Sequence, residues 1–295
     1  MTTEQTQALS RTFIYLGVLL IGTISASVLA SGVSLLFFGS GVSVTPGMPV
    51  PSDPASWWQL HLQNFISQAI GFGGTAWVAW RLWKDVPEGL LGNPAARKAN
   101  VLGLAILATV FSSPLLAASY ELNTHLIPEG GMLEALFLPL EKMLEALTTF
   151  IASAEGAKRL VVLFSVAALP AVFEELAFRG VLQPLLIRVT GHAWIGIVLA
   201  SVIFSAIHFQ FYGFLPRVLL GMLFGWLAYR SGSLIPGMAA HFVNNALAAV
   251  TLWLTGSMGE DLLDVTTPLI LLSLVLTGAL IWGLDRVIPR ASGSA

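Results

Sequence analysis

Long apolar stretches separated by short polar ones run along most of this chain. A helix that crosses a membrane needs about 20 consecutive, mostly apolar residues. By that measure the sequence predicts about eight spans, at residues 12–38, 64–83, 99–118, 160–189, 193–211, 213–230, 233–255 and 266–285. The expected fold is therefore an all-α integral membrane protein, with residues 1–295 forming a single polytopic membrane domain and any active site lying in the bundle core.

Composition supports lipid as the surrounding medium. Of the 295 residues, 56% are apolar and only 10% are charged, a balance that excludes an ordinary water-soluble domain. The absence of cysteine excludes disulfide scaffolds, thiolate metal sites and cysteine nucleophiles. A net charge of −2 gives no electrostatic footprint for nucleic acid, so no nucleic-acid partner is expected.

The longest connection between predicted spans covers residues 120–158 and forms an extramembrane loop. Within it, the segment MLEALFLPLEKMLEALTTFI spaces leucine and phenylalanine against Glu134, Glu141 and Glu145. This pattern predicts an amphipathic helix that lies on the membrane surface. The alternative is an irregular lid without membrane contact.

Basic residues are distributed unevenly between the two sides of the predicted bundle. With eight spans, both termini lie on one side, and the other side carries only Lys142, Lys158, Arg159 and Arg217. The side of the termini carries Arg11, Arg81, Lys84, Arg97, Lys98, Arg179, Arg188, Arg230, Arg286 and Arg290. The positive-inside rule therefore predicts that both termini are cytoplasmic.

The segment VFEELAFRGVL places Glu174, Glu175 and Arg179 inside a predicted span. A single charge at the centre of a bilayer costs roughly 3 kcal/mol on insertion scales, so these three need compensation. Glu175 and Arg179 are four residues apart, on one helix face, and can pair. Glu174 points about 100° away around the helix and is available for another task. The alternative is a buried ion cluster that only fixes helix packing.

Polar residues also interrupt two of the following spans. Glu174 lies 17 residues before Gly191, the predicted turn, and His208 lies 17 residues after it, so an antiparallel hairpin would bring the two to the same height. His241 and Asn245 lie one helical turn apart on a later span. We therefore expect the carboxylate and the imidazoles to meet in the bundle core.

These residue types suit the hydrolysis of a peptide bond. A carboxylate and an imidazole that flank a water molecule, here Glu174 and His208, can remove its proton. His241 and Asn245 can donate hydrogen bonds to the oxyanion of an attacked carbonyl group. Alternatively, Glu174, His208 and His241 could hold a divalent metal such as zinc. The cofactor is therefore either a divalent metal ion or none.

Three motifs occur in order on three of the predicted spans: EELAFR (174–179), FSAIH (204–208) and HFVNN (241–245). They resemble the EExxxR, FxxxH and HxxxN motifs of the CPBP family, which includes type II CAAX prenyl endopeptidases and the bacterial Abi homologues. The resemblance covers about residues 160–250, the predicted catalytic core. It implies an eight-helix intramembrane protease whose cavity opens toward the cytoplasmic side.

Carried over position by position, the resemblance implies that Glu174 is the general base and His208 its partner. His241 and Asn245 become the oxyanion donors. The supporting residues it implies are Glu175, Arg179 and Phe204, the last walling the cavity beside His208.

The family also implies the class of substrate. CAAX enzymes remove the last three residues of prenylated proteins, so the expected partners are a peptide or lipidated protein substrate and membrane lipid. One alternative function is that of a non-proteolytic membrane binding or immunity protein. Another is a proton-coupled transporter, because such proteins relay protons through intramembrane Glu and His residues.

Overall fold

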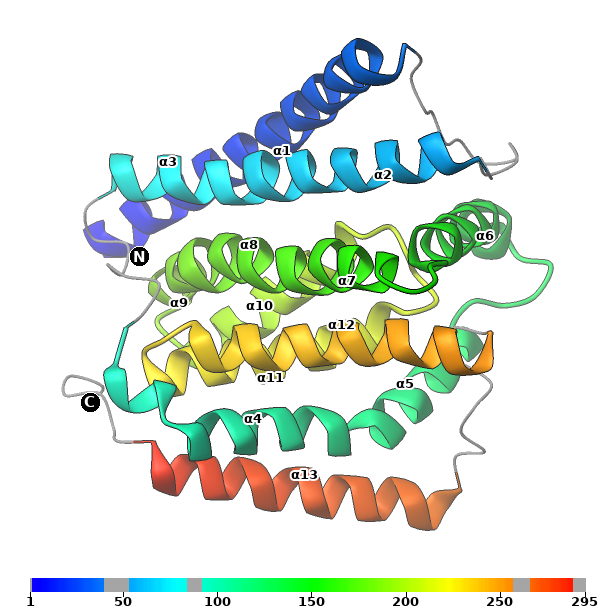
Figure 1. Ribbon diagram of the computed structural model, residues 1–295. Coiled ribbons are helices and arrows are strands. Elements are labelled where there is room, and N and C mark those ends of the chain that lie inside the picture. Colours follow the sequence, from blue (N-terminus) through cyan, green and yellow to red (C-terminus); the bar gives the residue numbers. More distant parts are fainter. Residues whose placement is uncertain (1, 40–52, 84–91, 257–265, 289–295) are drawn as a thin grey trace.

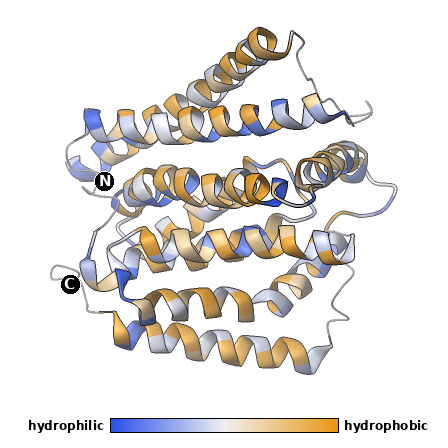
Figure 2. Ribbon diagram, in the orientation of Figure 1, coloured by the Kyte–Doolittle hydropathy of each residue, from blue (hydrophilic) through white to orange (hydrophobic). Residues whose placement is uncertain are grey.

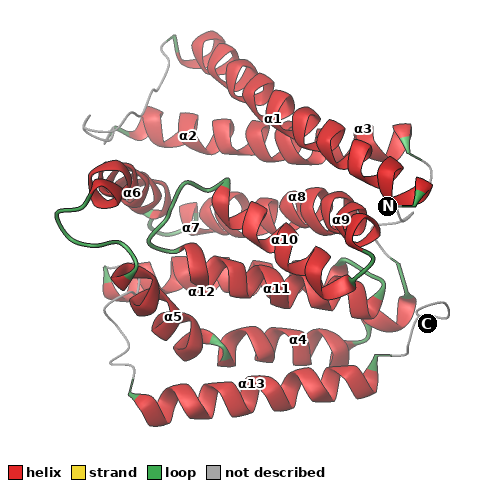
Figure 3. Ribbon diagram, turned by 180° about the vertical axis from the view of Figure 1, so that it is seen from behind, coloured by secondary structure: helices red, strands yellow, loops and turns green. Residues whose placement is uncertain are grey.

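The predicted apolar spans are helical in the computed structural model, which describes residues 2–39, 53–83, 92–256 and 266–288. Within those ranges all regular structure is helical, and most helices lie side by side along one common direction, whereas α1 crosses its neighbours at an angle (Figures 1 and 3). In chain order the helices are α1 (Thr3–Phe38), α2 (Pro54–Ile66), η1 (Ser67–Gly74), α3 (Thr75–Leu82), η2 (Pro94–Arg97), α4 (Ala99–Phe111), α5 (Ser113–His125), α6 (Met132–Ala152), α7 (Lys158–Val162), η3 (Leu163–Ala168), α8 (Leu169–Ala177), η4 (Phe178–Leu182), α9 (Gln183–Thr190), α10 (Ala193–Ala206), α11 (Phe214–Ser231), α12 (Ile235–Thr255) and α13 (Thr267–Val287).

Fewer helices qualify as membrane spans by length and composition than the sequence pattern predicts. Among the described residues, three helices are long and apolar enough to cross a membrane: α1, the continuous helix Lys158–Thr190 and α13. A fourth is added if α4 and α5, which meet at a 40° bend, form one span. Each predicted interval is helical over most of its length, but eight membrane crossings are not confirmed.

The outermost helices expose apolar side chains. Leu36 and Phe37 of α1 are 84% and 78% exposed, and Val275 of α13 is 66% exposed. Figure 2 shows hydrophobic residues along much of both helices. Such surfaces suit lipid, because apolar side chains exposed to water are unfavourable.

The first turn of α1 and the last turn of α13 lie at the same end of the bundle (Figure 1). This arrangement agrees with both termini lying on one side of the membrane, and their cytoplasmic placement stays a prediction. Arg179 was counted among the basic residues of that side, but it is only 3% exposed and pairs with Glu175 inside the bundle. It therefore adds no surface charge. Lys84 and Arg290 lie outside the described residues.

Helix α6 occupies the long connection for which an amphipathic helix was predicted, while residues 120–125 continue α5. It lies across the end of the bundle opposite the termini, and Figure 1 shows it nearly end-on. Its C-terminal carbonyl groups are held by two tryptophans: Trp57 Nε1 donates to Ile151 O at 3.0 Å, and Trp253 Nε1 donates to Ala152 O at 2.8 Å. Contact of α6 with the membrane surface stays a prediction.

Two tight hairpins set the relative heights of the central helices. Helix α9 ends at Gly191 and helix α11 ends at Gly232, both in the left-handed conformation, with φ of 70° and 63°. Glycine adopts this conformation without a Cβ clash, and it commonly ends a helix in this way. The turn between α9 and α10 therefore falls at Gly191, where the sequence predicted it.

Candidate active site

Glu174 and Glu175 lie on α8, part of the continuous helix Lys158–Thr190, and are only 5% and 0% exposed. Helix α8 packs against η1 and against α12, which carries His241. Buried carboxylates require charged or hydrogen-bonding partners. The surrounding helices supply such partners to both glutamates, and His241 lies close to each of them.

Glu175 belongs to a buried ion cluster. Its Oε1 lies 3.0 Å from Arg179 Nη1, one helical turn along, and 3.1 Å from His241 Nδ1. Arg179 also donates from Nη2 to Gly221 O at 3.1 Å, and its guanidinium lies 4.5 Å from the centroid of the Phe204 ring. Glu175 therefore joins α8 to α12, in addition to forming the pair with Arg179.

Glu174 shares His241 with Glu175, and its other neighbours are different. Its Oε1 accepts a hydrogen bond from Gln68 Nε2 at 2.9 Å. Its Oε2 lies 4.0 Å from His208 Nε2 and 3.9 Å from His241 Nε2. The expectation that this carboxylate and both imidazoles meet in the bundle core is thus met by the structure.

In both histidines Nδ1, the ring nitrogen that does not face Glu174, has a partner that fixes the orientation of the ring. His208 Nδ1 lies 2.7 Å from Phe204 O, and because a carbonyl oxygen can only accept, this nitrogen is the donor. In neutral His208 the Nε2 lone pair then faces Glu174. The ring of Phe204 packs edge-on against His208, with centroids 4.8 Å apart. Phe204 thus lies beside His208, where the family resemblance puts it.

Asn245 lies one turn after His241 and has a partner outside the carboxylate cluster. Pro170 has no N–H to donate to the carbonyl of Val166, four residues earlier. Asn245 Nδ2 donates to this carbonyl at 3.3 Å. One amide proton therefore satisfies a backbone acceptor in η3, and the other remains for a second acceptor.

Glu174, His208 and His241 are the residues that would hold a metal ion. Zinc ligands at about 2.0–2.2 Å in a tetrahedral site stand roughly 3.3–3.6 Å apart, which is closer than the 3.9 and 4.0 Å separations here. Among the described residues, no group of three or more His, Asp or Glu side chains is arranged to hold a metal. The present spacing does not fit zinc, whereas a water molecule about 2.8 Å from both Glu174 Oε2 and His208 Nε2 would bridge them.

Gln68 was missed by the sequence analysis. It is 7% exposed and belongs to η1, in the predicted span 64–83, far in sequence from the three motifs. A buried amide in an apolar span was a usable signal, but nothing in its spacing pairs it with Glu174. Only the packing of η1 against α8 brings them together.

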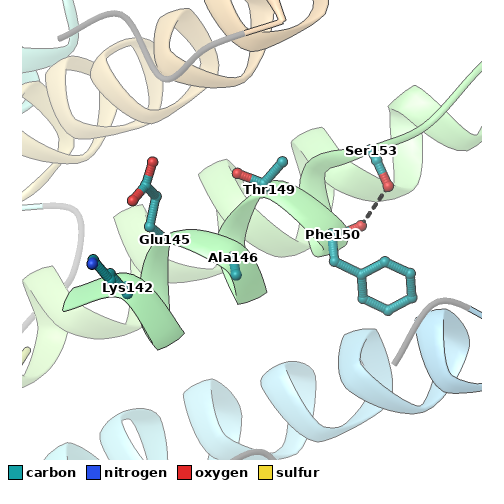
Figure 4. Close-up of a pocket in the computed structure, with 6 residues that line it drawn as sticks. All are labelled: Lys142, Glu145, Ala146, Thr149, Phe150 and Ser153. Carbon is teal, nitrogen blue, oxygen red and sulfur yellow. Dashed lines mark hydrogen bonds between the residues drawn. The ribbon is translucent and has the colours of Figure 1, made fainter. Parts of the chain in front are cut away.

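A surface hollow lies apart from this cluster, along α6 (Figure 4). Its lining residues are Lys142, Glu145, Ala146, Thr149, Phe150 and Ser153. It contains none of the site residues expected from the sequence. The hollow is therefore separate from the buried cluster.

Comparison with protein families gives a match over residues 156–247, to the model described as Type II CAAX prenyl endopeptidase Rce1-like. The matched interval contains all seven site residues expected from the sequence and excludes Gln68. It supports the resemblance to the CPBP proteases that the three motifs indicated. No curated protein and no solved structure matches the chain.

Proposed function

We propose that this protein, whose residues 156–247 match the CAAX protease family, is an intramembrane endopeptidase that hydrolyses a peptide bond with water activated by Glu174 and His208. The observation that carries the proposal is the position of Glu174 Oε2, 4.0 Å from His208 Nε2. A water molecule between them would donate one hydrogen bond to the carboxylate and one to the imidazole. Both groups can accept a proton as the oxygen attacks.

In the proposed reaction the water oxygen bonds to the carbonyl carbon of the substrate, and its proton passes to Glu174. The oxyanion that forms requires donors. His241, whose Nδ1 is held by Glu175, can donate from Nε2 when both of its ring nitrogens carry protons, and Asn245 donates its second amide proton. The C–N bond then breaks, and Glu174 returns the proton to the leaving amine.

The proposed substrate is the C-terminal part of a lipidated protein, and the proposed product is the released tripeptide. The burial of the cluster among helices with apolar outer faces supports a substrate that arrives from the membrane. The family match supports the prenylated class.

The test uses detergent-purified protein and a farnesylated CAAX peptide, with products followed by mass spectrometry. Glu174→Gln and His208→Ala should each lower the rate of tripeptide release by about 10² to 10⁴, because each removes a proton-transfer group. Glu145→Gln, the same change on the exposed face of α6, should behave as wild type. Activity should survive a chelator.

Full tripeptide release by folded Glu174→Gln would refute the assignment of the base. Loss of release on chelation, restored by zinc, would favour metal-activated water. No product from the wild type would favour a non-proteolytic membrane protein.

A further inference from the structure

The structure contains a cation close to the active site that the mechanism above does not use. Arg217, on the first turn of α11, donates from Nη1 to Gln210 O at 3.2 Å and from Nη2 to Gln210 Oε1 at 2.8 Å. Both acceptors are neutral oxygens. Gln210 lies only two residues after His208, in the loop between α10 and α11.

Arg217 differs from the other arginines that point between helices. Arg179 pairs with Glu175 at 3.0 Å, and Arg230 pairs with Asp285. Among the described residues, no ion pair within 4 Å joins Arg217 to a carboxylate, although the charge of Glu141 on α6 acts on it from farther away. A partly buried guanidinium is stabilised most by a directly bonded carboxylate or phosphate. The Arg217 guanidinium is therefore suited to bind an anion directly.

The loop that holds this cation is fixed in place. Asn123 of α5 donates from Nδ2 to Phe211 O at 2.6 Å and to Tyr212 O at 2.9 Å, and its Oδ1 accepts from the Leu215 N–H at 3.1 Å. Asn123 is only 4% exposed. The positions of Arg217 and His208 are therefore coupled through a rigid connection, as a preorganised binding site requires.

The distances suit a short C-terminal peptide. Two residues span at most about 7 Å, and a hydrogen bond adds about 3 Å, so the guanidinium lies within roughly 10 Å of the His208 backbone. Three extended residues reach about 10 Å and can therefore bridge any separation up to that limit. The charge of Arg217 also acts on both His208 and Glu174.

We propose that Arg217 binds the C-terminal carboxylate of the substrate. Binding the chain end there would place the bond three residues before it at the catalytic groups. The inference rests on the proposed protease function and adds the recognition of a free carboxylate. The carboxylate would displace the side chain of Gln210 from Nη2, because a guanidinium binds an ionised carboxylate more strongly than the neutral amide oxygen that it now contacts.

The experiment measures binding, so that it does not depend on cleavage. In the Glu174→Gln protein, the dissociation constants of a farnesylated CAAX peptide are compared for the free acid and for the C-terminal amide. The acid should bind roughly 10- to 100-fold more tightly. Adding Arg217→Gln should bring the ratio close to one, whereas Arg217→Lys should keep part of the preference.

Arg159→Gln is the matched control, because Arg159 is exposed on α7 and lies outside the cluster, and it should leave the ratio unchanged. Equal binding of acid and amide by the parent, or a preference that persists in Arg217→Gln, would overturn the inference. If the preference is found but wild-type protein releases no tripeptide, the carboxylate site stands and the protease function fails. If the wild-type protein cleaves the acid and the amide alike and binds both equally, the protease function stands and the carboxylate site fails.

Discussion

At the scale of single residues, the two oxygens of Glu174 have different environments. Oε1 accepts from Gln68 Nε2 at 2.9 Å, while Oε2 faces both imidazoles. A carboxylate held by one oxygen cannot rotate freely, so Oε2 stays directed at the proposed water. Gln68 would therefore be a positioning residue, which acts through Glu174 and touches no reacting atom.

Replacement of Gln68 by methionine, which has a similar shape but no donor, tests this role. Loss of a hydrogen bond to a charged group should lower kcat by about 10- to 100-fold, with a smaller change in KM. The measurement is the steady-state rate of tripeptide release by Gln68→Met.

A double-mutant cycle separates positioning from a general structural role. If Gln68 acts only through the Glu174 carboxylate, Gln68→Met should have little further effect once Glu174 is already Gln, so the two losses are not additive. Equal fractional losses in the two backgrounds would mean that Gln68 merely supports the fold.

At the scale of helices, the α9–α10 hairpin depends on a close approach of backbones. A Cβ atom added at Gly196 would lie 2.6 Å from Ile187 N and 2.8 Å from Ile187 Cα. Gly196→Ala should therefore lower the free energy of unfolding by about 1–3 kcal/mol, as overpacking does. The measurement is thermal or denaturant unfolding in detergent.

Gly278 on α13 provides the matched control, since a Cβ atom there meets nothing within 4 Å. Gly278→Ala should be neutral or should stabilise by up to about 1 kcal/mol, because alanine favours the helix. If both changes have the same effect, the hairpin does not depend on close packing at Gly196.

The sequence predicts features that depend on local signals. Apolar runs locate the helices, and Gly191 locates the turn between α9 and α10. Features that depend on packing between distant segments are not predictable in this way. The bond from Asn245 to Val166 O arises because Pro170 leaves that carbonyl free, and the contact of Gln68 with Glu174 requires η1 to lie against α8.

At the scale of the whole molecule, the distribution of polarity is that of a membrane protein. Apolar side chains face outward on α1 and α13, while Glu174, Glu175 and Arg179 are buried at the centre. Charges removed from both water and lipid must satisfy one another. Burying these charges therefore lowers the stability of the fold, and a catalytic role would explain why they are present.

The direction of the bundle in the membrane is open to a labelling test, because the chain contains no cysteine and any introduced one is unique. Gln7 and Val287 are exposed near the ends of α1 and α13, and Glu129 is exposed in the connection between α5 and α6. Figure 1 places that connection at the end opposite the termini. In intact cells, a membrane-impermeant maleimide should label Glu129→Cys and should reach Gln7→Cys and Val287→Cys only after permeabilisation.

Labelling of Gln7→Cys and Val287→Cys from opposite sides would contradict an even number of crossings. Labelling of all three in the reverse sense would contradict only the orientation inferred from the positive-inside rule.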